Sequence, residues 1–296
     1  MRVDWGELGA LNGSVASLAN DAQPPERWAS IGLLGDARTV LSRLPGGFVQ
    51  TTITSPPYWG LRDYGASGQI GLEDDPRDYV ATLAAIFTEV HRVTRSDGTL
   101  WLNLGDSYTS GGRKWRDADR KNPVRAMGTR PPTPDGLKPK DLVGIPWLVA
   151  FALQDAGWYL RSDIVWNKPN CMPESVKDRP TRSHEYLFLF SKSERYIYDN
   201  TAVRGDNDRN LRTVWNVPTR PFPGAHFATF PPELIRPCVT LASKRGDVIL
   251  DPFFGSGTVG IEAARQSRRF LGIELQPAYL EIARRRFEAE VTATLL

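Results

Sequence analysis

Short apolar runs bounded by turn residues alternate along the chain with longer segments in which apolar residues recur at helical spacing. The clearest helical segment covers residues 76–96, where apolar positions three and four apart form one face. These positions are Tyr79, Leu83, Ile86, Phe87 and Val90. Further helices are predicted over residues 37–41, 141–157, 232–241 and 277–290. Strands are predicted over residues 48–53, 99–104, 159–166, 186–190, 247–251 and 269–274.

The C-terminal part of the chain indicates the fold class. A strand, a helix, a second strand and a second helix follow one another between residues 247 and 290. This order is typical of a parallel sheet with helices on its faces, so the sequence predicts an α/β fold. Residues 1–30 show weak periodicity and are predicted to form a loosely attached arm, which leaves residues 31–296 as one domain.

Composition narrows the class of protein. Of the 296 residues, 41% are hydrophobic, which is enough for a sizeable core. No apolar run approaches the roughly 20 residues that span a membrane. The N-terminal residues lack the apolar stretch of a secretory signal, so a cytoplasmic protein is expected. The two cysteines and three histidines show neither metal-ligand spacing nor a disulfide framework, so no metal site is expected.

Positive charge is concentrated in one segment. The formal net charge of the whole chain is only +3, but residues 107–140 contain nine Lys or Arg against three Asp, a net charge of +6. This segment is poor in apolar residues, which predicts a long mobile loop. Either it is a solvated surface, or its cations bind the phosphates of DNA. The candidate phosphate contacts are Arg113, Lys114, Arg116, Arg120, Lys121 and Arg125.

A glycine-rich loop follows the predicted strand 247–251. Residues 255–260 match the pattern G-x-G-x-x-G, and Glu274 lies 19 positions beyond Gly255 at the end of the next strand. This pattern is typical of dinucleotide binding, so a nicotinamide-dependent dehydrogenase is one interpretation. Asp251 at the mouth of the loop argues against it, because a carboxylate repels a pyrophosphate and attracts a cationic ligand such as S-adenosylmethionine. A tight turn without a ligand is the third interpretation.

A second loop follows the predicted strand 48–53 and reads Ser55-Pro56-Pro57-Tyr58. The two prolines fix two φ angles and remove two donors, so the Pro56 carbonyl is held in one direction beside the Ser55 hydroxyl. Two such acceptors would hold both N–H bonds of an amino group and localise the nitrogen lone pair for attack on a methyl donor. Tyr58 offers a ring on which an extruded base can stack. The alternative is a proline-stiffened structural turn.

The two loops together resemble the motifs of prokaryotic amino-group DNA methyltransferases. Residues 55–58 match the catalytic motif (D/N/S)-P-P-Y of that family, and residues 251–258 match its cofactor motif D-P-F-x-G-S-G-T. Residues 166–169, 184–186 and 226–231 resemble further family segments. The catalytic motif precedes the cofactor motif, which is the circularly permuted order called the β class. The resemblance covers roughly residues 31–290 and implies a Rossmann-like sheet, mostly parallel with one reversed strand.

By this resemblance, S-adenosylmethionine is the cofactor, and the two loops must meet at one edge of the sheet. The catalytic residues are then Ser55, Pro56, Pro57 and Tyr58. The cofactor-binding residues are Asp36 near the adenine, Glu274 at the ribose, and Asp251, Pro252, Phe253, Gly255, Ser256, Gly257, Thr258, His226, Phe227 and Ala228 around the methionine part. Residues 170–222 occupy the position of the family's target-recognition region, and its candidate DNA contacts are Arg179, Arg182, Arg209 and Arg212.

The first residue of the catalytic motif bears on the target base. Serine at this position, preceded by Thr54, resembles enzymes that methylate N4 of cytosine, whereas adenine-N6 enzymes more often carry aspartate. The resemblance therefore implies a site-specific methyltransferase acting on cytosine N4 in double-stranded DNA, with adenine N6 as the alternative. A C5-cytosine enzyme would need a Cys nucleophile in its catalytic loop, and Cys238 lies instead in a predicted helix. A cognate restriction endonuclease and a homodimer are the further partners to consider.

Overall fold

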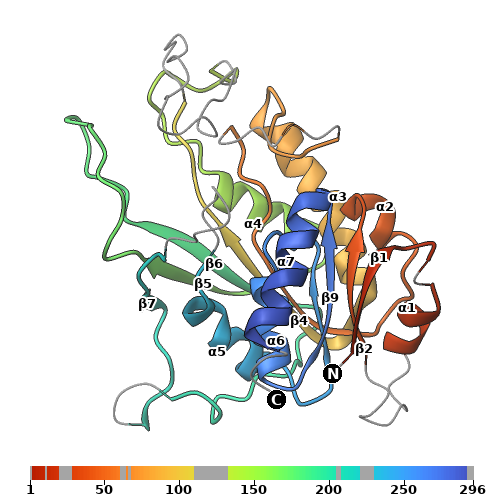
Figure 1. Cartoon of the computed structure of the whole chain (residues 1–296). Coiled ribbons are helices and arrows are strands. Elements are labelled where there is room, and N and C mark those ends of the chain that lie inside the picture. Colours follow the sequence, from red (N-terminus) through yellow and green to blue (C-terminus); the bar gives the residue numbers. More distant parts are fainter. Residues whose placement is uncertain are drawn as a thin grey trace.

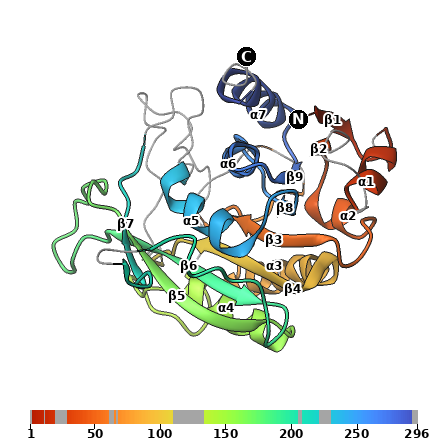
Figure 2. The ribbon, with the colours of Figure 1, turned by 90° about the horizontal axis from the view of Figure 1, so that it is seen from below.

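The computed structural model describes residues 2–10, 12–19, 29–60, 65, 68–109, 133–204, 208–220 and 230–291, and the structural statements below concern these residues. Their centre is a nine-stranded sheet (Figure 1), in the order β1-β2-β9-β8-β3-β4-β6-β5-β7 (Figure 2). The strands are β1 (Arg2–Glu7), β2 (Ala29–Leu34), β3 (Val49–Thr54), β4 (Thr94–Leu104), β5 (Tyr159–Asn167), β6 (His184–Ser191), β7 (Val214–Asn216), β8 (Val248–Asp251) and β9 (Arg269–Glu274).

The strand directions confirm the predicted sheet. Neighbouring strands are parallel everywhere except at β6, which runs antiparallel to both β4 and β5. β6 is therefore the one reversed strand, and it forms a hairpin with β5. The central strands β3, β8 and β9 are buried along their whole length, as expected for parallel strands that are covered on both faces.

Two layers of helices cover the sheet. The helices are α1 (Asn12–Leu18), α2 (Ala37–Leu41), α3 (Pro76–Val93), α4 (Ile145–Asp155), α5 (Pro232–Ala242), α6 (Thr258–Arg265) and α7 (Pro277–Glu290). α1 to α4 pack on one face and α5 to α7 on the other, each layer with its own apolar core (Figure 2). Strand alternation supplies both cores: on β4, Leu100 and Leu102 enter the first and Trp101 the second. In the described part of the chain, no helix is long and apolar enough to cross a membrane.

The N-terminal residues belong to the domain, so the prediction of a loosely attached arm is wrong for the described residues 2–10 and 12–19. β1 pairs in parallel with β2 and forms an edge of the sheet. Trp5 on β1 packs against three aromatic rings. These are Phe254, Phe270 and Phe287, with centroid separations of 6.4, 6.2 and 6.3 Å. The weak periodicity arises because this edge strand has four partly buried residues and an exposed residue at each end.

The sheet topology creates a crevice between β3 and β8. From β3 the chain passes through α3 to β4 on one side, and from β8 it passes through α6 to β9 on the other. In α/β sheets, ligands bind at the carboxyl ends of the strands where the connections diverge in this way. The loop that begins at Ser55 leaves β3 at this edge, and the glycine-rich loop leaves β8 beside it.

Candidate active site

The two motif loops contact each other directly. The Thr54 hydroxyl donates a hydrogen bond to the Asp251 carboxylate, with 2.6 Å between Oγ1 and Oδ1, and both side chains are buried. The two residues lie 197 positions apart in the sequence, and the pairing of β3 with β8 brings them together. The expectation that both loops meet at one edge of the sheet is confirmed.

A cavity of about 300 Å³ lies between these loops. It is lined by most of the predicted catalytic and cofactor-binding residues, namely Asp36, Ser55, Pro56, Pro57, Tyr58, Asp251, Pro252, Phe253, Gly255, Ser256, Thr258 and Glu274. Gly257 does not line it but caps α6 with a φ of 79°, and a Cβ there would lie 2.8 Å from the Cβ of Ala283. Gly257 therefore permits α6 to pack closely on α7. The predicted residues His226, Phe227 and Ala228 lie outside the described residues.

Two carboxylates stand at the ends of the adjacent strands β2 and β9. Glu274 accepts hydrogen bonds from the backbone N–H groups of Gly255 and Gln276, at 2.7 and 2.8 Å, which ties β9 to the glycine-rich loop. Asp36 caps α2 and accepts a hydrogen bond from the Arg38 guanidinium at 2.7 Å. Burial raises the pKa of Glu274, whereas the hydrogen bond from Arg38 lowers the pKa of Asp36. Both carboxylates keep lone pairs for the hydroxyl or amino groups of a ligand.

Asp251 gives the cavity a site for a cation. Burial raises the pKa of Asp251 to about 7, although hydrogen bonds from Thr54 and from the Phe253 N–H act in the opposite direction. Among the described residues, no cationic side chain pairs with Asp251 or Glu274. A positively charged ligand would stabilise the ionised form of Asp251, whereas a pyrophosphate would be repelled. The acids of the cavity therefore fit the sulfonium and ammonium groups of S-adenosylmethionine.

Packing and a hydrogen bond to its backbone help to hold the Ser-Pro-Pro-Tyr loop in place. The Tyr79 hydroxyl on α3 donates to the Pro57 carbonyl at 2.8 Å. A Cβ on Gly71 would lie 2.9 Å from the Tyr58 carbonyl oxygen, and a Cβ on Gly105 would lie 2.6 Å from the Tyr58 ring. Both glycines are therefore needed for the loop and its aromatic ring to sit where they do.

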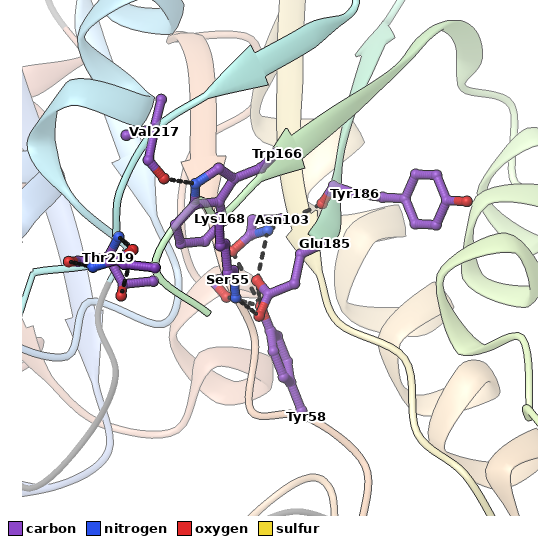
Figure 3. Close-up of polar contacts among 10 residues, drawn as sticks. Ser55, Tyr58, Asn103, Trp166, Lys168, Glu185, Tyr186, Val217 and Thr219 are labelled. Carbon is purple, nitrogen blue, oxygen red and sulfur yellow. Dashed lines mark hydrogen bonds and ion pairs between the residues drawn. The ribbon is translucent and has the colours of Figure 1, made fainter. Parts of the chain in front are cut away.

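Three residues whose roles the sequence did not reveal complete this end of the cavity (Figure 3). They are Asn103 on β4, Lys168 just after β5 and Glu185 on β6. The Tyr58 hydroxyl lies 2.7 Å from Oε2 of Glu185 and 3.1 Å from Oδ1 of Asn103. Lys168 forms an ion pair with Glu185, and the Ser55 hydroxyl donates to the Tyr58 hydroxyl at 3.3 Å.

The hairpin register brings Lys168 and Glu185 together. Trp166 on β5 stands opposite Glu185 on β6, so the residue that leaves β5 two positions later reaches the same corner. The Trp166 indole N–H donates to the Val217 carbonyl at 2.7 Å, and the Lys168 ammonium lies 4.3 Å from the centroid of the Trp166 ring. The resemblance of residues 166–169 and 184–186 to family segments was the signal that could have identified these residues.

Two of the predicted DNA contacts are held against the segment that follows β4. The Arg179 guanidinium lies 3.8 Å from the centroid of the Tyr108 ring. Arg182 lies 3.8 Å from Asp106, and its side chain is only 16% exposed. Both arginines therefore anchor the connection between β5 and β6, and Arg182 is placed poorly for reading a base.

Of the other predicted DNA contacts, the structure describes two and leaves six outside the described residues. Arg209 and Arg212 are exposed on the segment that leads to β7. The basic residues Arg113, Lys114, Arg116, Arg120, Lys121 and Arg125 lie outside the described residues. The range 170–222 also contains β6 and β7, which are hydrogen-bonded within the sheet, so only the parts outside these strands can form a separate recognition region.

The cavity combines two carboxylates that have no cationic partner among the described residues, Asp251 and Glu274, with a corner built around Ser55. This pairing suits a cationic methyl donor and an amine, and with the sheet topology it defines the class of S-adenosylmethionine-dependent methyltransferases. Residues 49–285 match the model of the DNA methylase family that comprises N6 and N4 methyltransferases, and the chain belongs to this family.

Similar proteins agree with this assignment. The chain is 63% identical over 262 residues to the type II methyltransferase M.Cfr9I of Citrobacter freundii. This alignment covers 87% of each protein. It is 56% identical over 260 residues to the type II methyltransferase M.SmaI of Serratia marcescens, covering 86% of this chain and 89% of that one. The protein is therefore an S-adenosylmethionine-dependent DNA methyltransferase, and the dehydrogenase interpretation is discarded.

Two solved structures share the fold. A DNA modification methylase of Thermus thermophilus, TTHA0409, solved in complex with S-adenosyl-L-methionine, has a TM-score of 0.64 at 27% identity and covers 88% of this chain and 93% of its own. The cytosine-N4-specific PvuII DNA methyltransferase has a TM-score of 0.67 at 21% identity and covers 88% and 89%. At 21% identity, the similarity to the PvuII enzyme shows a shared fold alone.

Proposed function

We propose that this protein methylates N4 of cytosine in double-stranded DNA. The observation that carries the proposal is the contact between Thr54 and Asp251, because it joins the amine-binding corner to the cofactor loop. Ser55 and Pro56 supply the two acceptors, a hydroxyl oxygen and a carbonyl oxygen. Within the described residues, no donor is hydrogen-bonded to the Pro56 carbonyl, so this acceptor is available to a substrate.

The residues of the chain align the amine and leave its lone pair exposed. S-adenosylmethionine supplies the methyl group as a sulfonium cation. Hydrogen bonds to Ser55 and Pro56 would draw both amino hydrogens out of the plane of the ring, so that the nitrogen lone pair is no longer conjugated with it. Fixed acceptors of this kind need no reorganisation during the reaction. Serine is too weak a base to deprotonate the amine first, so the nitrogen becomes cationic when it gains the methyl group and then releases its proton to water. The Tyr58 ring lines the same cavity and can stack on a base that has left the duplex.

In this proposal, each carboxylate of the cavity binds a different part of the cofactor. Asp251 and the glycine-rich loop bind the methionine part, Glu274 binds the ribose, and Asp36 lies toward the adenine. The positions of Asp36 and Glu274 at the ends of adjacent strands support this division. His226, Phe227 and Ala228 keep the role that the family resemblance implies.

The identity of the first motif residue supports cytosine over adenine. Ser55, preceded by Thr54, stands where adenine-N6 enzymes more often carry aspartate. The chemistry of the two amino groups is nearly the same, so adenine N6 is the second candidate. The type II relatives support a site-specific modification enzyme that acts beside a cognate endonuclease, in the cytoplasm of a prokaryote. The DNA contacts are proposed to come from residues 113–125 and from Arg209 and Arg212.

Nucleoside analysis tests the proposal. DNA incubated with the protein and labelled S-adenosylmethionine is digested, and the labelled nucleoside is identified by mass spectrometry. N4-methylcytosine is the expected product, N6-methyladenine would establish the second candidate, and unlabelled DNA would overturn both. Ser55→Ala is expected to abolish methylation while calorimetry still detects cofactor binding, which assigns the loss to the amine-binding corner.

A further inference from the structure

The ion pair between Lys168 and Glu185 lies beside the catalytic corner and has no role in the proposed function so far. It connects to Ser55 through a chain of hydrogen bonds that passes through the Tyr58 hydroxyl (Figure 3). Both charged side chains are largely buried, with 17% of Lys168 and 16% of Glu185 exposed. A shielded pair of this kind keeps its strength at moderate salt concentrations.

The direction of each hydrogen bond in this chain can be assigned. The Lys168 ammonium only donates, and it occupies Oε1 of Glu185. The Asn103 amide N–H₂ donates to Oε2 of Glu185 at 3.2 Å and to the Tyr186 carbonyl at 3.0 Å, which leaves its oxygen facing Tyr58. Glu185 is therefore surrounded by donors, as an ionised carboxylate requires.

Tyr58 has one hydroxyl hydrogen and two candidate acceptors. Oε2 of Glu185 is both charged and nearer, at 2.7 Å against 3.1 Å for Oδ1 of Asn103, so the hydrogen points to Glu185. Burial and the neighbouring Glu185 carboxylate raise the pKa of Tyr58 well above its ordinary value, which keeps this hydrogen in place. Toward Ser55, the Tyr58 oxygen can then only accept. The Ser55 hydroxyl must donate to it, and the lone pairs of Ser55 remain for the substrate.

We propose that the Lys168–Glu185 ion pair sets the polarity of Ser55 and thereby selects a base with an amino group over one with a carbonyl group. The proposal rests on the proposed function, in which Ser55 and Pro56 hold the amine. An amino group donates to both oxygens, whereas a carbonyl oxygen in the same place would face their lone pairs. Without the charge on Glu185, the Ser55 hydroxyl is free to turn and donate to a carbonyl. Lys168 and Glu185 are positioning residues that act through Tyr58.

Base discrimination in binding tests this role. The duplex that the wild-type protein methylates is prepared with its target cytosine or with uracil, which carries a carbonyl at position 4, and both affinities are measured without methyl donor. The mismatch cost of uracil is common to all variants and cancels in the ratio. Glu185→Gln keeps the shape of the side chain and removes its charge. It is expected to lower the preference for cytosine by about tenfold, the scale of one hydrogen bond, and to reduce kcat while KM for the cofactor is unchanged.

Three further variants separate this role from a structural one. Glu262→Gln on α6 removes the charge of another buried carboxylate, which pairs with Arg236 at 3.0 Å outside the cavity, and it should leave the cytosine preference and kcat unchanged. Tyr58→Phe removes the hydroxyl through which Glu185 acts on Ser55, so it should reproduce the loss of preference seen with Glu185→Gln, and it carries the comparison if that variant does not fold. Lys168→Met leaves the carboxylate in place without its ion-pair partner and should shift the preference in the same direction by a smaller factor. A preference within twofold of wild type in a folded Glu185→Gln or Tyr58→Phe variant would overturn the proposal.

The experiment distinguishes an incorrect target base from an incorrect role of the ion pair. If wild-type protein forms N6-methyladenine, the cytosine assignment is wrong, but the polarity of Ser55 can still be tested with adenine and hypoxanthine as the paired bases. If wild-type protein methylates cytosine and the ratio does not change in the variants, only the role of the ion pair is lost.

Discussion

Replacing Thr54 by Val removes the hydrogen bond between Thr54 and Asp251, which links the ends of the strands that carry the two motif loops. Valine keeps the shape and β-branching of threonine, so the change isolates the hydroxyl that donates to Asp251 at 2.6 Å. Asp251 would keep its hydrogen bond from the Phe253 N–H at 3.1 Å, but its ionised form would lose its strongest donor. We therefore expect both stability and the titration of Asp251 to change.

The size of the effect depends on pH. A hydrogen bond to a charged group contributes about 1.5–3 kcal/mol, against about 1 kcal/mol for a neutral one, so ionised Asp251 should lose about 1 kcal/mol more than the protonated form. That difference corresponds to a rise of roughly one unit in the pKa of Asp251, from its present value of about 7. The pKa of Asp251 lies above its ordinary value of 3.8, so the folded state binds the proton more tightly than the unfolded chain. The free energy of unfolding therefore falls as pH rises from about 4 to about 7, and in the variant this fall extends about one unit higher.

Urea unfolding at pH 6 and at pH 8.5 measures both quantities. The variant should be less stable than wild type by about 1 kcal/mol at pH 6 and by about 2 kcal/mol at pH 8.5. Thr52→Val is the matched control, because Thr52 is buried on the same strand and its hydroxyl has no hydrogen-bond partner among the described residues. The control should cost little at either pH. An equal loss at both pH values in Thr54→Val would refute the coupling between Thr54 and Asp251.

Three further predictions concern the site and its support. Affinity for S-adenosylmethionine should rise as pH increases from 6 to 8, because ionised Asp251 attracts the sulfonium. Affinity for the product, in which the sulfur is an uncharged thioether, should rise less. Calorimetry of both ligands across this pH range would show parallel curves if Asp251 did not face the sulfur. Gly105→Ala should lower kcat by about tenfold or more while the protein stays folded, because the added Cβ would lie 2.6 Å from the Tyr58 ring; an unchanged kcat would show that the ring position is unimportant. Trp5→Ala should cost about 2 kcal/mol of unfolding free energy because it removes the contacts of β1 with three aromatic rings, and a detached N-terminal segment would show no loss.

Local sequence patterns were sufficient to predict much of the fold. The predicted helix over residues 277–290 is α7, because a proline begins it and its apolar positions keep helical spacing. The helix over residues 37–41 is α2, with Asp36 as its cap. β1 was missed because an edge strand with partly buried residues has little hydrophobic pattern to detect. Its attachment depends on Gly32, which makes room for the Trp5 ring, and this contact is invisible in the sequence.

Site residues that belong to one continuous sequence motif could be predicted, whereas those contributed by several different strands could not. The Ser-Pro-Pro-Tyr and glycine-rich loops each carry their own pattern, so both were found. Asn103, Lys168 and Glu185 come from three different elements, and only the register of β4, β5 and β6 brings them to Tyr58. Alternation of apolar and polar residues fixes which face of the sheet a side chain takes, but not which residue of the neighbouring strand stands opposite it, so it could not place these side chains. The structure also differs from the sequence prediction at Arg182, since a charged residue in a loop gives no sign that most of its side chain will be covered beside Asp106.

The wide sequence separation between Thr54 and Asp251 has a consequence for synthesis in the cell. Chains are made from the N-terminus, and contacts between distant residues form only after the later residue has left the ribosome. A nascent chain that already carries the amine-binding corner still lacks β8, β9 and the glycine-rich loop between them. An unfinished polypeptide therefore lacks the cofactor loop and cannot methylate DNA, and this capacity arises only after the last two strands have entered the sheet between β2 and β3.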